Sequence, residues 1–171
     1  KDLMMSICVW RLVPVWCVLI AGSVSAADWP HWMGPSFNGI SAETGWKSDW
    51  GQDGVPVLWK ARVGIGYSTV SVAGGRLYTM GHHGGEETIY CFDAETGKEI
   101  WKHSYKAQLV DNLHKGGPAA TPTIDGEQVF TLSRDGRLLA LEAATGKVIW
   151  EQSLIATTKA KLPEWGVSSS V

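Results

Sequence analysis

Residues 90–101 read Tyr-Cys-Phe-Asp-Ala-Glu-Thr-Gly-Lys-Glu-Ile-Trp, and residues 139–150 read Leu-Ala-Leu-Glu-Ala-Ala-Thr-Gly-Lys-Val-Ile-Trp. The tryptophans that end the two stretches, Trp101 and Trp150, lie 49 residues apart. A repeat of this length is typical of proteins built from small stacked units, because one unit cannot bury its apolar face alone. The sequence therefore predicts a repeat architecture.

The similarity between the two copies extends upstream of these stretches. Ser68–Met80 aligns with Ala120–Leu132 at a spacing of 52 residues, so the first copy contains three more residues than the second. The additional residues fall within the segment Gly81–Glu87, which is rich in glycine and histidine. A third copy is expected to begin at Trp165.

Each copy contains short runs of β-branched and aromatic residues separated by Gly, Asp and Pro, which is the pattern of strands joined by tight turns. Pairs such as Asp125-Gly126 and Asp135-Gly136 supply the glycine that a tight hairpin requires. No segment has a clear helical period, and at most one helical turn is expected, within 106–115. The predicted strands cover 57–63, 68–72, 76–80, 88–92, 98–103, 121–124, 128–133, 137–142 and 147–153.

Four antiparallel strands per copy, repeated in tandem, predict an all-β fold, a partial β-propeller of four-stranded antiparallel blades. The first blade is expected over 66–104, the second over 117–153, and the start of a third over 165–171. Since propellers close with about 4 to 8 blades, we expect the chain to be the N-terminal fragment of a longer protein.

The final tryptophan of each copy ends a fourth strand, where a large flat side chain can cover the seam to the next blade. Burying one such ring contributes about 2 to 3 kcal/mol by area. We assign the repeat signature a structural role; its members are Asp93, Thr96, Gly97, Trp101, Glu142, Thr145, Gly146 and Trp150.

The first 26 residues differ in composition from the rest of the chain. Arg11 precedes an apolar run that ends at Ala21, and small residues follow as far as Ala26. This is the pattern of a secretory signal peptide, and the run is shorter than the roughly 20 apolar residues of a membrane span. We therefore expect an exported protein, periplasmic or secreted, without a membrane span after cleavage. Residues 27–56 are then an N-terminal extension.

Charge and cysteine usage exclude several classes of protein. The 15 Lys and Arg residues are scattered singly among 17 Asp and Glu residues, with a formal net charge of −2, so no basic face is available for nucleic acid. Cys8 and Cys17 lie in the predicted signal, which leaves Cys91 as the only cysteine of the exported part. A disulfide scaffold is therefore excluded, and Cys91 is predicted to be a small buried apolar residue.

The pattern Asp/Glu-Ala-x-Thr-Gly-Lys-x-x-Trp, following a strand of the type Gly-x-Leu/Val-Tyr/Phe, resembles the pyrroloquinoline-quinone-type (PQQ-type) propeller repeat. This repeat is shared by quinoprotein alcohol dehydrogenases and by the outer-membrane assembly-factor propeller BamB, and the resemblance covers about 59–171. Residues 28–41 also resemble the opening of exported propeller proteins of planctomycete-like bacteria. In that group, Leu58-Trp59-Lys60 lies in an outer strand, here within 57–63, that closes the ring by joining the last blade.

The resemblance implies two functions of different classes. The favoured one is a binding or scaffold module of the cell envelope, whose partner is a protein or another envelope component. The alternative is the N-terminal part of a PQQ-dependent alcohol or sugar dehydrogenase, whose PQQ and calcium ligands lie in other blades. No catalytic, cofactor-binding or metal-binding residue is assigned, because the sequence lacks the adjacent cysteine pair of such dehydrogenases.

Several polar residues are candidates for ligands or bases. Asp93, Asp111, Asp125 and Asp135 are explained as turn residues. The pair His82-His83 and His114 could meet at one rim as metal ligands, although histidines on glycine-rich loops are more often simply solvated. The aromatic residues Tyr67, Tyr78 and Trp165 are candidates for lining a channel mouth, with packing as the alternative.

Overall fold

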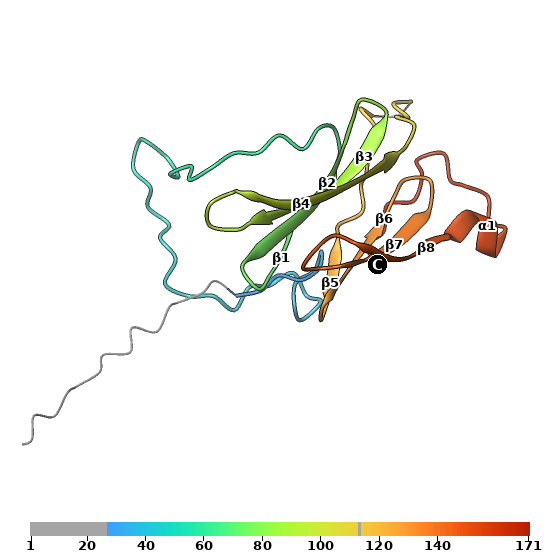
Figure 1. Ribbon diagram of the computed structural model, residues 1–171. Coiled ribbons are helices and arrows are strands. Elements are labelled where there is room, and N and C mark those ends of the chain that lie inside the picture. Colours follow the sequence, from blue (N-terminus) through green and yellow to red (C-terminus); the bar gives the residue numbers. More distant parts are fainter. Residues whose placement is uncertain (1–26, 113) are drawn as a thin grey trace, which may run out of the picture.

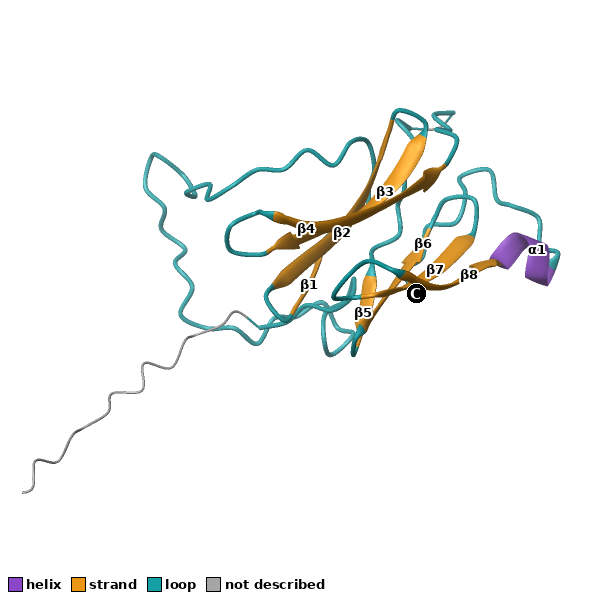
Figure 2. Ribbon diagram, viewed as in Figure 1, coloured by secondary structure: helices purple, strands orange, loops and turns teal. Residues whose placement is uncertain are grey.

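The computed structural model describes residues 27–112 and 114–171. Over these residues the chain forms two four-stranded antiparallel sheets, in each of which consecutive strands pair (Figures 1 and 2). The signal peptide predicted over 1–26 lies outside the described residues. The first sheet consists of β1 (Ser71–Ala73), β2 (Arg76–His83), β3 (Glu86–Asp93) and β4 (Glu99–Lys106), and the second of β5 (Thr123–Asp125), β6 (Gln128–Leu132), β7 (Arg137–Glu142) and β8 (Val148–Ser153).

The predicted all-β fold of four-stranded antiparallel blades is confirmed. Each of the eight strands overlaps one predicted run, and β7 matches its run residue for residue. β2 and β3 are longer than predicted because the insertion in the first copy extends their hairpin to a turn at Gly84 and Gly85. The β-type run at 57–63 belongs to neither sheet, since no described strand pairs with it.

Helical structure is not where the sequence placed it. No helix forms in the described residues of 106–115, because Lys106 is still in β4 and the N–H of Ala107 donates to the carbonyl of Gly85. A five-residue helix, α1 (Leu154–Thr158), follows β8 instead. The Ser153 hydroxyl caps it by accepting the N–H of Ala156 at 3.2 Å, a common reason for a helix to begin.

Matching rows of side chains cross the two sheets. In the first sheet the row runs from Ser71 through Tyr78 and Cys91 to Trp101, and all four residues are buried. This face packs on the second sheet and forms one core with it. The core residues are Tyr78, Met80, Ile89, Cys91, Trp101, Tyr105, Ile124, Val129, Leu139, Leu141 and Ala143.

The equivalent row of the second sheet runs from Thr123 through Phe130 and Ala140 to Trp150. Trp150 is 40% exposed, whereas Trp101 is 8% exposed. Trp150 packs on Phe130 of its own sheet, with 6.0 Å between ring centroids, and does not cover a seam between described sheets as the sequence predicted. The difference arises because the second sheet has no described sheet on that side.

The repeated Thr-Gly turns are held by their own side chains. Asp93 Oδ1 accepts the N–H of Thr96 at 2.8 Å and its hydroxyl at 2.6 Å, and these bonds lower the pKa of Asp93 below its ordinary value. In the second turn the Thr145 hydroxyl donates to Glu142 at 2.7 Å. The glycine that follows has a φ of +70° in the first turn and +72° in the second, which an L side chain rarely adopts.

Each turn receives a tryptophan from a preceding segment. Trp101 Nε1 donates to the carbonyl of Ala143 at 2.9 Å, and its indole lies directly over Gly146. Trp59 Nε1 likewise donates to the carbonyl of Ala94 at 3.1 Å, and its ring lies over Gly97. The same contact therefore occurs twice, once between the sheets and once on the outer side of the first sheet.

We predict that Trp101→Ala destabilises the chain by about 3–5 kcal/mol, because it removes a buried ring and a hydrogen bond together. Trp150→Ala is the matched control, and its loss is expected to be about 1 kcal/mol because that ring is already half solvated. Urea unfolding of both variants checks this. Equal losses would show that Trp101 does not hold the seam.

We predict that Gly146→Ala is much more destabilising than Gly126→Ala. Both glycines have positive φ, +72° and +56°, so both alanines are expected to lose about 1 kcal/mol through backbone strain. Only at Gly146 would the new Cβ overlap the ring of Trp101, whereas Gly126 faces open space. Thermal unfolding of the two variants measures the difference, and a similar melting temperature would contradict the contact.

Candidate functional site

An inner pocket of about 560 Å³ lies where the two blades and both ends of the described chain meet. Tyr67 and Thr69 precede β1, and Ala119 and Thr121 occupy the equivalent places before β5. The segment 168–171 provides a third wall. The remaining lining residues come from the N-terminal extension and are His31, Trp32, Met33 and Phe37.

Hydroxyl groups connect the inner ends of the repeats. The hydroxyls of Thr69 and Thr121 lie 2.8 Å apart, and Ser71 donates to the carbonyl of Pro122 at 2.5 Å. One unit further on, Ser170 Oγ accepts the N–H of Thr121 at 3.3 Å, and Thr123 donates to the carbonyl of Val171 at 2.7 Å. The last residues of the chain therefore lie against the second blade much as 121–123 lies against the first.

The N-terminal extension crosses both blades at this inner edge. The backbone of Trp29 exchanges two hydrogen bonds with Val72, at 2.7 and 2.9 Å, and the carbonyl of Pro30 accepts the N–H of Ile124 at 2.8 Å. Nothing in the sequence of this segment reveals these contacts, because they depend on the relative placement of β1 and β5.

Aromatic rings are exposed around the inner pocket. Phe37 is 73% exposed although it stacks on His31 with 3.8 Å between centroids, and Tyr67 is 51% exposed with an edge contact to His114. Such rings, together with hydroxyls, suit the burial of apolar or planar groups of a partner.

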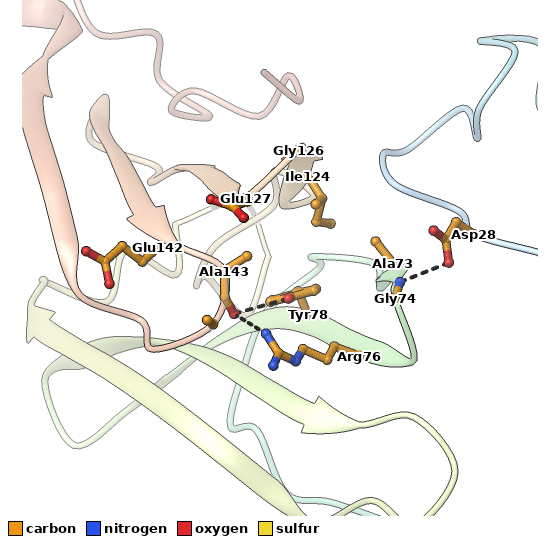
Figure 3. A pocket seen from close by; sticks show the side chains of 11 residues that line it. Asp28, Ala73, Gly74, Arg76, Tyr78, Ile124, Gly126, Glu127, Glu142 and Ala143 are labelled. Carbon is orange, nitrogen blue, oxygen red and sulfur yellow. Dashed lines mark hydrogen bonds between the residues drawn. The ribbon is translucent and has the colours of Figure 1, made fainter.

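A second pocket, of about 530 Å³, lies between the turns at one end of the seam (Figure 3). Arg76 and Tyr78 of the first blade both donate to the carbonyl of Ala143, at 3.1 and 3.3 Å. Burial raises the pKa of Tyr78 to about 12, so it remains a neutral donor. Glu127 and Glu142 reach the pocket from the second blade. Tyr78 therefore contributes to the contact between the two blades and does not line the inner pocket.

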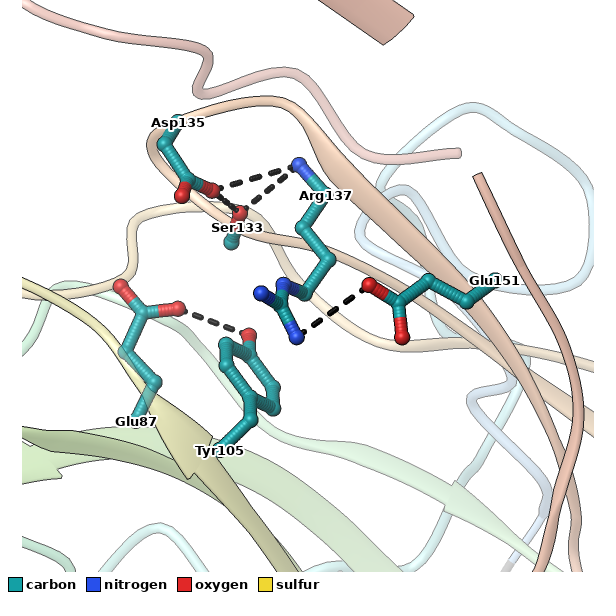
Figure 4. A network of polar contacts seen from close by, with 6 residues as sticks. All are labelled: Glu87, Tyr105, Ser133, Asp135, Arg137 and Glu151. Carbon is teal, nitrogen blue, oxygen red and sulfur yellow. Dashed lines mark hydrogen bonds and ion pairs between the residues drawn. The ribbon is translucent and has the colours of Figure 1, made fainter. Parts of the chain in front are cut away.

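A polar network occupies the other end of the seam (Figure 4). Tyr105 donates to Glu87 Oε2 at 2.7 Å, and both residues are buried. The Arg137 guanidinium lies 4.7 Å from the centre of the Tyr105 ring and pairs with Glu151 at 3.2 Å. Sequence analysis missed Glu87, because a glutamate in a polar insertion gives no sign that it is buried.

The histidines do not come together as a metal site. His82 is buried and its Nε2 lies 3.0 Å from the carbonyl of Ala107, while His114 Nδ1 accepts the N–H of Gly116. His83 is exposed. Within 27–112 and 114–171, no group of three or more His, Cys, Asp or Glu side chains could hold a metal ion. Trp165 is 61% exposed and lies outside the set that lines the inner pocket.

Cys91 is a fully buried thiol, as predicted. Burial raises its pKa to about 11, so the thiol is protonated at neutral pH and a poor nucleophile.

We predict that the Cys91 thiol of the folded chain reacts with a disulfide reagent at least about 100-fold more slowly than in urea, because the thiolate is scarce and shielded. The measurement uses a variant in which Cys8 and Cys17 are replaced by serine. Equal rates with and without urea would contradict the burial of Cys91.

Residues 37–169 match the model of the family described as outer membrane protein assembly factor BamB. The chain belongs to this PQQ-like repeat family. The described part of the chain has no helix with the length and apolarity needed to cross a bilayer.

Quinone-dependent enzymes are among the curated relatives. The chain is 34% identical over 71 residues to quinohemoprotein alcohol dehydrogenase ADH IIB of Pseudomonas putida. The aligned region covers 37% of this chain and 10% of the relative. It is 33% identical over 66 residues to 1-butanol dehydrogenase (quinone) of Thauera butanivorans, and this alignment also covers 37% of this chain and 10% of the relative. The chain therefore spans about a tenth of the length of these relatives.

Two solved structures are also similar. Quinohemoprotein alcohol dehydrogenase from Comamonas testosteroni has a TM-score of 0.46 at 22% identity, covering 63% of this chain and 16% of that one. BamB from Moraxella catarrhalis has a TM-score of 0.30 at 22% identity, covering 52% of this chain and 36% of that one. The two four-stranded sheets and the family match together show the propeller-type fold.

The inner pocket does not suit a calcium-bound quinone, the group that a dehydrogenase of this family would need. Calcium takes 6–8 oxygen ligands in proteins, with carboxylates prominent among them. None of the residues that line the pocket is an aspartate or glutamate. Thr69 and Thr121 already use their hydroxyls on each other.

Proposed function

We propose that the chain is part of an exported PQQ-like propeller that acts as a binding or scaffold module of the cell envelope. The observation that carries the proposal is the inner pocket of about 560 Å³, which is lined by rings of the N-terminal extension and Tyr67 and by hydroxyls of both blades, with no Asp or Glu side chain. The family match, whose description is an assembly factor, supports a protein or another envelope component as the partner.

The arrangement of the propeller is part of this proposal. Trp59 lies on the first turn as Trp101 lies on the second, which supports 57–63 as the outer strand of a blade that closes the ring. The hydrogen bonds from Thr121 and Thr123 to 170–171 support 165–171 as the start of a third blade. The proposed blades are 66–104 and 117–153.

Crosslinking in the native host tests the binding function. We predict that a photoreactive phenylalanine at position 67, in place of the pocket residue Tyr67, captures a discrete envelope component that mass spectrometry identifies. The same group at Ile100 is the control, since that residue is 42% exposed on β4, away from the pocket. Equal capture at both positions, or none at position 67, would contradict a binding role of the pocket.

The second candidate is a segment of a PQQ-dependent alcohol or sugar dehydrogenase, and the matches to two quinone-dependent enzymes favour it. In that case this segment is scaffold, and the quinone and calcium ligands belong to other blades. Adding PQQ and calcium to the full-length protein separates the candidates. A bound quinone after dialysis, seen by absorbance, together with alcohol oxidation would establish the enzyme.

A further inference from the structure

The three-residue insertion of the first copy places an acidic side chain in the seam. It lengthens the β2–β3 hairpin, and at the far end of the first sheet His82, Glu87 and Tyr105 lie opposite one another on three neighbouring strands. At the repeat spacing of 49 residues, Gly136 is the equivalent of Glu87 in the second copy. The repeat itself therefore does not require an acid at this position.

Glu87 is buried, and none of the ion pairs found among the described residues involves it. Its side chain is 3% exposed, and the bond from the Tyr105 hydroxyl is the one hydrogen bond found for its carboxyl among the described residues. Arg137, the nearest guanidinium in the network, is paired with Glu151 and stacked on Tyr105 (Figure 4). An ionised carboxylate in such a place is costly because one neutral donor replaces its water shell.

The groups that face Glu87 come from both sheets. His82 on β2 and Tyr105 on β4 belong to the first sheet, whereas Asp135, in the β6–β7 turn, and Arg137, on β7, belong to the second. Asp135 opposes a negative charge on Glu87, while His82 and Arg137 favour it. Glu151 pairs with Arg137, and His103 is close enough to interact electrostatically with both of them.

We propose that Glu87 makes the seam between the two blades a proton-linked joint, meaning that the stability of the contact between the blades depends on the protonation of Glu87. The contact is most stable with the carboxyl protonated and is weakened when Glu87 ionises. Protonated, the carboxyl and the Tyr105 hydroxyl form a neutral pair inside the core. Ionised, Glu87 favours any opening that lets water reach it, and the contact of Arg137 with Tyr105 lies at the point of opening.

The direction of the effect follows from burial, which raises the pKa of Glu87 above its ordinary value of 4.5. Between the unfolded and the folded pKa the folded chain holds one more proton than the unfolded chain. The stabilisation from this group is complete below the unfolded pKa and is lost as pH rises through the folded pKa. One linked proton changes the unfolding equilibrium constant by at most about tenfold per pH unit.

The test is urea unfolding of the chain and of Glu87→Gln between about pH 4 and about pH 8, a range that covers the titration of carboxyls and histidines. Glu86→Gln is the matched control, because Glu86 is the exposed neighbour on the same strand. We expect the unfolding constant of the wild type, relative to Glu87→Gln, to rise by up to about tenfold per pH unit above the ordinary glutamate pKa. Glu86→Gln should follow the wild type. Parallel profiles for the wild type and Glu87→Gln would overturn the proposal.

A second measurement starts from the wild-type chain and does not depend on any substitution at Glu87. Carbon NMR of the wild-type chain with labelled glutamate follows the carboxyl carbons of Glu87 and Glu86 through a pH titration. We expect Glu87 to titrate at higher pH than Glu86, and Tyr105→Phe to move it higher still, since the Tyr105 bond lowers that pKa. Titration of Glu87 at or below the pH of Glu86 would refute the joint.

Discussion

The contact between a tryptophan indole and the Thr-Gly turn of the following unit holds the two sheets in their relative position. Trp101 satisfies the carbonyl of Ala143 and covers Gly146, so it fixes both the distance and the rotation between the two sheets. The turn needs glycine for its positive φ and also for the space that the ring occupies. Because a hydrogen bond and a large buried area act at the same point, sliding one blade along the other would break both.

The seam is apolar at its centre and polar at both ends. Ile89, Cys91 and Leu139 are fully or almost fully buried at the centre, where volume and shape decide the fit. At one end three donors converge on the carbonyl of Ala143, and at the other Glu87 meets Tyr105. The first end specifies the register of the blades with neutral or permanently charged donors. The second contains a group whose charge depends on pH, so the two ends of one interface respond differently to the solution.

The inner pocket and the contact between the blades use different faces of the same repeat. The residues that stack the blades point into the seam, whereas the inner pocket is formed by the segments that precede β1 and β5, by 168–171 and by the N-terminal extension. Equivalent positions of successive units, such as Thr69 and Thr121, meet there because the inner ends of the blades converge. Tyr67 and Phe37 line this pocket and take no part in the tryptophan contacts, so they can differ between proteins that share the fold. A fold alone does not determine function.

The amino-acid sequence alone predicts the repeat, the four-stranded units, all eight strands to within three residues of both ends, the glycine turns and the burial of Cys91. These features follow from local patterns, namely alternation of apolar residues, turn chemistry and spacing. Three features come instead from packing in three dimensions: Glu87 is buried, Trp29 pairs with Val72 and Trp150 is half exposed. Each of these depends on which surface lies opposite in space, and neither residue type nor spacing along the chain contains that information.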